Sequence, residues 1–143
     1  MPRNPTRSAP FAKVRVDHAT ETAEDYVEAV DDILRDRGEC RVRDLAKHMG
    51  VSHVTVTRIV SRLQDQGLLR QDPYQPVHLT PEGEQLAAQS RRRHEIVLQF
   101  LLALGVPPEA ARHDAEGIEH HVGKATLRCM KKFIDDHPEE DNG

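Results

Sequence analysis

The segment from residue 44 to residue 80 constrains the fold of this 143-residue chain most strongly. Apolar residues at helical spacing lie on both sides of Gly50, and the small Ala46 allows two helices to approach closely. Gly50 supplies the turn residue that a tight bend between helices favours, and Ser52 is a suitable N-cap for the second helix. These features predict a helix-turn-helix, with a short helix over residues 42–49 and a second helix that starts at Ser52 and ends before Gly67.

Two short strand-like runs follow the second helix, over residues 68–71 and 77–80. The segment Asp-Pro-Tyr-Gln-Pro at 72–76 joins them and is rich in turn-forming residues. A hairpin directly after a helix-turn-helix has the form of a wing. We therefore expect a mainly α fold, in which an N-terminal winged helix-turn-helix with a small β-hairpin wing precedes a C-terminal helical domain.

The remaining segments divide the chain into four expected parts. Residues 1–19 contain Pro2, Pro5 and Pro10 and read as a disordered basic arm. The winged helix-turn-helix occupies 20–80 and opens with a helix from about Glu21, capped by Thr20 or Thr22, to Arg37. A helical domain occupies 81–137, with helices over about 81–104, 108–121 and 124–136. Residues 138–143 form a polar tail that we expect to be disordered.

Charge is segregated along the chain, although its formal net charge is only −4. Residues 17–34 carry seven acids and no base, whereas residues 35–70 carry eight bases against four acids. The basic region holds the second helix of the predicted helix-turn-helix, whose exposed face suits phosphates and base edges. We predict DNA contacts from Ser52, His53, Thr55, Thr57, Arg58 and Arg62. A structural helical hairpin, or a winged helix that docks a protein, is the alternative.

A second cluster of polar residues lies near the C-terminus, at Glu116, Glu119 and His120. On a helix these positions, at i, i+3 and i+4, share one face, so two carboxylates and an imidazole converge. Oxygen ligands with one nitrogen and no thiolate suit a hard divalent cation such as Mn(II) better than structural zinc. The competing interpretation is a surface helix whose Glu and His side chains face water.

Three further candidates are weak when each is taken alone. Asp25 and Glu28, one helical turn apart, are typical of a solvated acidic face, and His94 on an apolar face is typical of a core histidine. Together with the C-terminal cluster they match a known pattern. The chain resembles the manganese transport regulator branch of the diphtheria toxin repressor (iron-dependent repressor) family. The segments that carry the resemblance are 24–28, 51–63, 93–95 and 114–121.

The resemblance implies a metal site. In that branch a pair of Mn(II) ions lies between the DNA-binding lobe and the dimerisation helices. The matching ligand positions here are Asp25, Glu28, His94, Glu116, Glu119 and His120, with two ions per subunit. The iron-sensing branch typically has methionine and cysteine where this chain has Asp25 and Glu116, and the two hard carboxylates favour Mn(II).

The resemblance also implies a function. We expect a Mn(II)-responsive repressor of manganese uptake genes that binds double-stranded DNA as a homodimer at a pseudo-palindromic operator, and not an enzyme. Cys40 and Cys129 have no CxxC spacing and no apolar run reaches about 18 residues, which favours a cytoplasmic protein without a membrane segment. The alternatives are a metal-independent winged-helix regulator and a carboxylate-bridged di-metal enzyme. The enzyme would need Glu-x-x-His pairs on two helices, and no histidine of the sequence has a Glu three residues before it.

Overall fold

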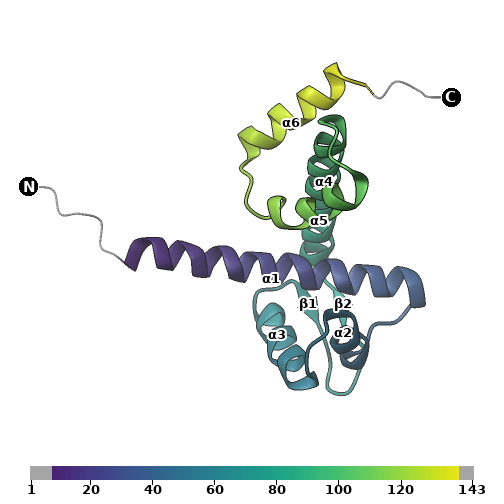
Figure 1. Ribbon diagram of the computed structural model, residues 1–143. Helices are drawn as coiled ribbons and strands as arrows, with labels where there is room; N and C mark the ends of the chain where they lie inside the picture. Colours follow the sequence, from purple (N-terminus) through teal and green to yellow (C-terminus); the bar gives the residue numbers. More distant parts are fainter. Residues whose placement is uncertain (1–7, 139–143) are drawn as a thin grey trace, which may run out of the picture. The chain divides into compact units, whose positions relative to one another are not determined.

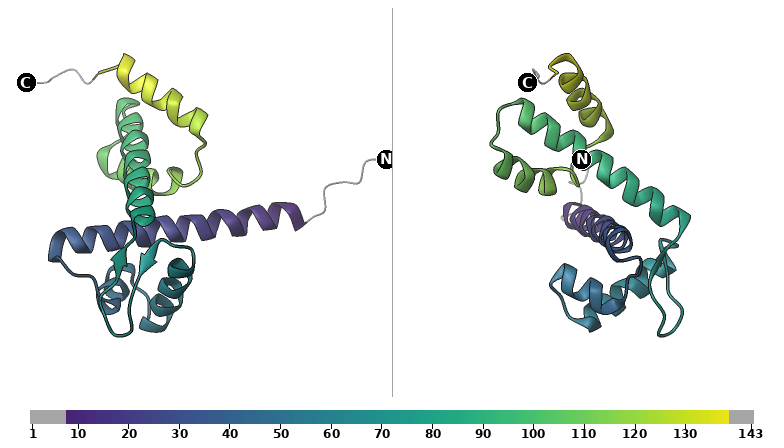
Figure 2. Two further views of the ribbon diagram at one scale, coloured as in Figure 1. Left: turned by 180° about the vertical axis from the view of Figure 1, so that it is seen from behind. Right: turned by 90° about the vertical axis from the view of Figure 1, so that its right-hand side faces the viewer.

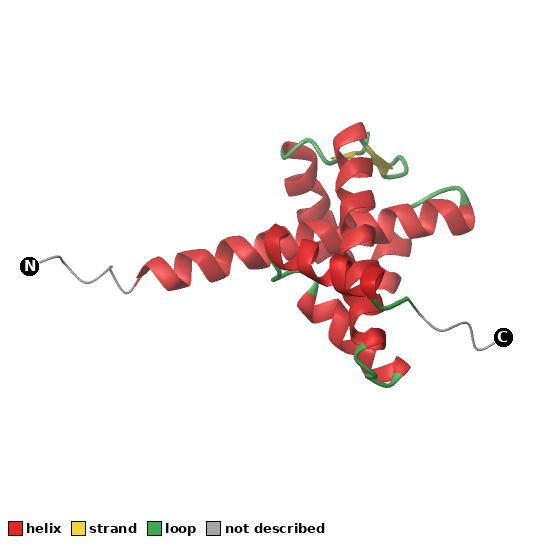
Figure 3. Cartoon of the chain, turned by 90° about the horizontal axis from the view of Figure 1, so that it is seen from above, coloured by secondary structure: helices red, strands yellow, loops and turns green. Residues whose placement is uncertain are grey.

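A computed structural model of the chain describes residues 8–138, which divide into two compact units that part after Ala88. Almost all of the regular structure is helical, and two short strands form the one sheet of the described residues (Figures 1 and 3). The elements are α1 (Ser8–Arg37), α2 (Val42–Met49), α3 (His53–Asp65), β1 (Leu69–Arg70), β2 (His78–Leu79), α4 (Pro81–Ala103), α5 (Pro108–Ile118) and α6 (Lys124–Asp136). The predicted fold class is confirmed.

The N-terminal unit is built on the apolar stripe of α1. Figure 2 shows α2, α3 and the hairpin gathered on one side of this helix. α1 packs against α2 and β2, and α3 packs against α2 and β1. Tyr26, Val27 and Val30 of α1 share one buried cluster with Leu45 of α2 and Val60 of α3. The helix-turn-helix is therefore fixed to the helix that carries Asp25 and Glu28.

Local chemistry sets the turn between α2 and α3. Gly50 adopts a left-handed conformation (φ 68°), and its N–H donates to the carbonyl of Ala46. A left-handed residue is favourable here because glycine has no Cβ to clash. Ser52 then caps α3, since its side-chain oxygen accepts from the backbone N–H of Thr55 at 3.2 Å. Both features are as predicted.

The wing is a short antiparallel hairpin. Leu69 pairs with Leu79 and Arg70 with His78, so each strand is shorter than the sequence predicts. The hairpin is tied to the rest of the unit by the N–H of Val77, which donates to the carbonyl of Cys40 at 2.7 Å. These contacts hold the wing beside the helix-turn-helix.

The C-terminal unit contains the rest of α4, together with α5 and α6. Gly105, at φ 92°, ends α4, and the chain turns back through Val106 to begin α5 at Pro108. Phe100 of α4 meets Phe133 of α6 edge to face, with ring centroids 5.4 Å apart. α6 has no buried residue, although its apolar side chains follow helical spacing. None of the described helices has the length and hydrophobicity needed to span a membrane.

The start of the first helix differs from the prediction. α1 begins at Ser8, so residues 8–19 are helical rather than a disordered arm, and Thr20 and Thr22 lie inside the helix instead of capping it. No glycine or proline interrupts residues 11–37, and Pro10 falls in the first turn, where its missing N–H costs no helical hydrogen bond. The predicted arm over residues 1–7 and the predicted tail over 139–143 lie outside the described residues.

The end of the fifth helix also differs. α5 stops at Ile118 rather than His121, and Glu119 serves as its C-cap. The N–H of His121 donates to the carbonyl of Ile118 at 3.0 Å, which closes a tighter turn after the helix. Gly117 and the β-branched Ile118 are weak helix formers, so the last turn has little propensity to continue.

Candidate metal centre and DNA-binding face

A carboxylate–imidazole cluster lies inside the C-terminal unit. The Nδ1 atom of His94, on α4, is 3.0 Å from Glu119 Oε2 and 3.6 Å from Glu116 Oε1. One ligand atom from each of the three side chains lies within 4.8 Å of the others, which is a suitable spacing for a shared cation. Two carboxylates and one imidazole form a donor set for a divalent metal ion.

Glu119 is the centre of this cluster. Its carboxylate is almost completely buried, and its Oε1 atom lies 3.4 Å from Nε2 of His120 while Oε2 faces His94. A buried carboxylate is costly unless a cation or a hydrogen-bond donor accompanies it. The structure therefore places a negative charge between two imidazole rings, where either a proton or a metal ion can compensate it.

The predicted ligands of this unit come together, but only partly for the reason that the sequence suggested. Glu116 lies on α5, and its C-cap Glu119 keeps helical dihedrals, so these two carboxylates share one face, whereas His120 belongs to the following turn. His94, which taken by itself is typical of a core histidine, joins the cluster from α4. The turn at the end of α5 places His120 beside Glu119.

Asp25 and Glu28 lie on α1 of the N-terminal unit. They are one helical turn apart and partly buried, on either side of the buried pair Tyr26 and Val27. The helix presents two carboxylates beside the core that fixes the helix-turn-helix.

The predicted DNA-contacting residues line the start and the outer side of α3. His53, Thr57, Arg58 and Arg62 are exposed. Ser52 is exposed as well, but its oxygen caps the helix, and it lies 3.0 Å from the hydroxyl of Thr55. Ser52 and Thr55 therefore shape the helix terminus, whereas the other four offer free side chains to a ligand.

Exposure reveals further residues that the sequence analysis missed. Val54, on the same helix start, is 76% exposed, and Tyr74, at the wing tip with φ 61°, is 95% exposed. A groove of about 770 Å³ lies between α3 and the wing, and Arg41 and Arg43 contribute positive charge to its wall. Arg41 and Arg43, before and inside α2, are a signal of positive charge that the sequence shows. The exposure of Val54 and Tyr74, in contrast, cannot be predicted from a local sequence pattern.

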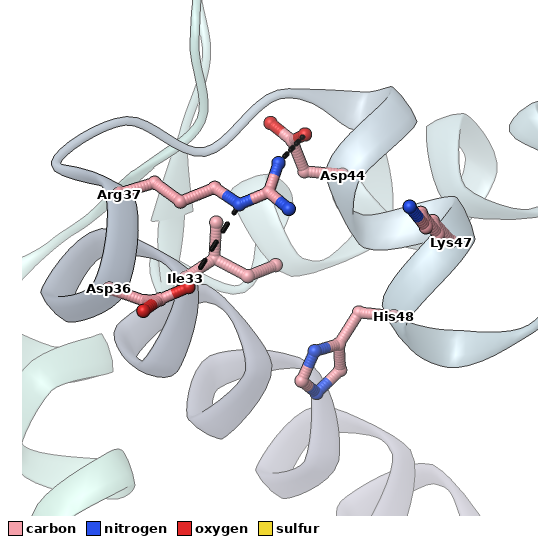
Figure 4. A pocket seen from close by; sticks show the side chains of 6 residues that line it. All are labelled: Ile33, Asp36, Arg37, Asp44, Lys47 and His48. Atoms are coloured by element: carbon pink, nitrogen blue, oxygen red, sulfur yellow. Dashed lines mark hydrogen bonds and ion pairs between the residues drawn. The ribbon is translucent and has the colours of Figure 1, made fainter.

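A smaller hollow of about 290 Å³ lies between the end of α1 and α2 (Figure 4). Its Arg37 guanidinium is 3.3 Å from Asp44, and the other oxygen of Asp44 accepts from the backbone N–H of Arg41 at 2.9 Å. One carboxylate thus joins the end of α1 to the start of α2. These contacts assign the hollow to the helix–helix junction.

The fold and the cluster together define a class of protein. A winged helix-turn-helix, followed in the chain by a helical unit with a carboxylate–imidazole cluster, is typical of a metal-dependent DNA-binding protein. Comparison with known families agrees. A family model described as "Iron dependent repressor, N-terminal DNA binding domain" matches residues 18–77. A second, "Iron dependent repressor, metal binding and dimerisation domain", matches residues 80–142. The chain belongs to the iron-dependent repressor family.

Individual relatives support the same assignment. The chain is 49% identical over 127 residues to "Transcriptional regulator MntR" of Escherichia coli O6:H1, which covers 89% of this chain and 82% of the relative. It is 38% identical over 103 residues to "HTH-type transcriptional regulator MntR" of Lysinibacillus sphaericus, covering 72% of this chain and 74% of that one. The chain is a metal-dependent, DNA-binding transcriptional repressor that acts as a homodimer, and it is not an enzyme.

A solved structure is similar as well. The one described as "Manganese-dependent transcriptional repressor complex with manganese" superposes with a TM-score of 0.70 at 26% identity, over 79% of this chain. The chain spans about half the length of that structure, 52%. The predicted fold, family and regulatory class are confirmed, and neither alternative from the sequence analysis stands.

Proposed function

We propose that this protein is a Mn(II)-responsive repressor of manganese uptake genes. The observation that carries the proposal is the His94–Glu116–Glu119 cluster, whose ligand atoms lie within 4.8 Å of one another. Hard carboxylate oxygens outnumber nitrogens there, and the cluster holds no sulfur ligand, which suits Mn(II). The names of the relatives and of the similar structure point in the same direction.

The full ligand set takes residues from both units. We assign to it the six predicted residues, which together provide four carboxylates and two imidazoles: Asp25, Glu28, His94, Glu116, Glu119 and His120. Four carboxylates can balance the charge of two divalent ions, so we propose two ions per subunit. Glu119, with an oxygen toward each of two imidazoles, is suited to a central place in such a site.

The ligand set gives the chain a way to couple metal and DNA. Bound metal supplies positive charge that offsets the mutual repulsion of the carboxylates. Asp25 and Glu28 are fixed through the α1 core to the helix-turn-helix, and the other four ligands belong to the unit that carries the dimerisation domain. Ligation by both groups therefore favours one arrangement of the recognition helices. By linkage, DNA must tighten metal binding by the same factor.

The DNA target follows from symmetry. A homodimer with a two-fold axis presents two recognition helices, and these fit successive major grooves of a pseudo-palindromic operator. We propose that Arg58 reads a base and that Arg62 contacts a phosphate, with Val54 and Tyr74 extending the contact surface. Such a regulator works where the chromosome lies, which in a bacterium is the cytoplasm.

Selectivity cannot come from affinity, because Mn(II) is the weakest binder in the divalent order. We propose that Zn(II) binds but activates poorly, since it accepts fewer ligands in tetrahedral geometry and leaves the second ion position empty. The carboxylates of Asp25 and Glu116 supply the anionic oxygens that a second hard ion needs.

The test measures binding to a duplex that the wild-type protein selects from a random-sequence pool in the presence of Mn(II). Affinity is titrated against Mn(II), Zn(II) and Co(II) at fixed salt, for the wild type and for Asp25→Met with Glu116→Cys. The wild type should respond to Mn(II) more strongly than to Zn(II), and the double variant should shift toward Co(II) because its new ligands are softer. If the double variant responds to Mn(II) as the wild type does, Asp25 and Glu116 do not determine metal selectivity.

A further inference from the structure

Tyr26 carries a hydroxyl group with no hydrogen-bond partner in the described part of the chain. The residue is 3% exposed and belongs to the buried cluster that joins α1 to α3. Its hydroxyl oxygen is buried and has no hydrogen-bond partner among the described residues. A buried hydroxyl without a partner costs free energy, and a phenylalanine would fill the same space without that cost. The hydroxyl therefore calls for a functional explanation.

A positive charge on α3, that of Arg62, acts on this hydroxyl. Burial raises the pKa of Tyr26, and the positive charge of Arg62 works in the opposite direction. The Arg62 guanidinium is thus within electrostatic range of the phenol. Arg62 itself is exposed on α3, two residues after the buried Val60.

We propose that Tyr26 is a positioning residue for Arg62. On DNA, the phenol oxygen accepts one N–H of the Arg62 guanidinium, and the other N–H groups of the guanidinium face a phosphate. The inference rests on the proposed function, because it takes α3 as the DNA-contacting helix and Arg62 as a phosphate contact.

Arginine suits this arrangement because its planar group has five N–H donors in a fixed fork. One donor can be held by the protein while others bind the phosphate. A long exposed side chain loses rotamer freedom when it binds, and an anchor on the protein reduces that loss at the moment of DNA binding. The hydroxyl, which has no hydrogen-bond partner among the described residues, then becomes paired in the complex.

The experiment is a double-mutant cycle on the duplex selected by the wild-type protein, at saturating Mn(II). Tyr26→Phe should weaken binding roughly tenfold, as for a hydrogen bond to a charged group. In an Arg62→Ala background the same change should cost less than about twofold, since the partner is gone. Tyr26→Phe should also reduce the slope of log affinity against log salt by up to about one, as loss of a phosphate contact does.

Arg58→Ala is the matched control, because Arg58 is an exposed arginine one turn earlier on the same helix. Tyr26→Phe should keep its full effect in that background. Without DNA, Tyr26→Phe should leave the unfolding temperature unchanged or raise it, because the hydroxyl that it removes has no hydrogen-bond partner in the part of the chain that the structure describes. A clear fall in that temperature would make the hydroxyl a structural group and overturn the inference.

Tyr26 directly follows the proposed ligand Asp25, so Mn(II) affinity is measured for the same variants. Unchanged Mn(II) affinity is expected, and a loss of operator binding that disappears at higher Mn(II) would assign the effect to the metal site instead. Equal costs of Tyr26→Phe with and without Arg62 would also overturn the inference. A wild-type protein that selects no duplex with Mn(II) would refute the proposed function itself, which is a distinct outcome.

Discussion

Gly83 occupies a position on α4 where any side chain would collide with the wing. A Cβ atom there would overlap the carbonyl oxygen of Leu68 and lie 3.2 Å from the side chain of Leu79. The hydroxyl of Thr80 fixes this approach, since it donates to the carbonyl of Gly67 at 2.6 Å and accepts from the N–H of Gly83 at 3.0 Å. The start of α4 and the wing are therefore packed backbone against backbone.

Gly83→Ala should lower the free energy of unfolding by about 1–3 kcal/mol, because backbone atoms cannot move aside as a flexible side chain can. Gly117→Ala is the control: a Cβ at Gly117 meets nothing within 4 Å, and alanine is the better helix former by about 0.8–1 kcal/mol. Urea unfolding of both variants checks this. Similar effects at the two positions would contradict the close approach.

Cys40 is a buried thiol whose pKa rises from 9.0 to about 12, chiefly through burial, with the charge of Asp44 adding to the effect. Since the thiolate is the reactive form, iodoacetamide at pH 8 should modify the exposed Cys129 and spare Cys40 in the folded protein. Mass spectrometry of the labelled peptides checks this. Equal labelling of both residues would contradict the burial of Cys40.

The same shift predicts how stability depends on pH. Between about pH 9 and pH 12 the unfolded chain loses the Cys40 proton while the folded protein keeps it. The unfolded state then binds fewer protons, so this contribution to stability is complete below about pH 9 and is lost as the pH rises through about 12. The stability of Cys40→Ala, followed by urea unfolding, should fall less steeply over that range than that of the wild type.

Some residues of the candidate site could be predicted from the sequence, and others could not. Glu116, Glu119 and His120 were visible because their identity and spacing are local properties of the sequence. The contact of Glu119 with His94 was not, because it depends on how α5 returns beside α4 and on where α5 ends. The exposure of Val54 and Tyr74 likewise depends on the packing of α3 and the wing, which no local pattern contains.

Helices with a chemical signal at their ends were predicted within a residue or two. Gly50 and Ser52 bound the turn between α2 and α3, Thr80 with Pro81 starts α4, and Gly105 follows its end. α1 lacks such a signal at its start, since its sequence remains compatible with a helix upstream of Glu21. α5 ends without a left-handed glycine. Because no such signal marks its end, the helix was predicted to continue to His121, three residues too far.

Ser52 has two roles that substitution can separate. Ser52→Ala removes the acceptor of the Thr55 N–H and should cost about 1 kcal/mol of stability. Ser52→Asp keeps a capping oxygen and should retain the stability, but it places a negative charge where we propose phosphate contacts, and operator binding should fall. Thermal unfolding and duplex binding, measured on the same samples, check the two effects. If Ser52→Ala loses operator binding and Ser52→Asp does not, this assignment of the two roles is wrong.

At the scale of the whole molecule, the fold class and the order of elements followed from periodicity, because the helical and strand-like apolar spacings differ. The apolar face of α6 adds an expectation about assembly. Leu127, Met130, Phe133 and Ile134 follow helical spacing, yet none of them is buried within the chain. A second copy of the chain is the partner that the dimerisation domain implies.

Sedimentation velocity at micromolar concentration should therefore show a dimer, with and without Mn(II). Leu127→Glu should shift the equilibrium toward the monomer, because it would bury an unpaired charge in the interface. Arg128→Glu changes a neighbouring exposed residue and should leave the dimer intact. A monomeric wild type under both conditions would contradict the proposed symmetry of the operator.

If metal held by the Glu119 cluster controls DNA binding, metal binding and DNA binding must be lost together when Glu119 is changed. Mn(II) binding and duplex binding are measured together for the wild type, for Glu119→Gln and for the exposed control Glu109→Gln. We expect Glu119→Gln to lose Mn(II) binding and Mn(II)-dependent duplex binding together, while Glu109→Gln keeps both. If duplex binding by Glu119→Gln stays as strong and as dependent on Mn(II) as in the wild type, the Glu119 cluster does not control DNA binding.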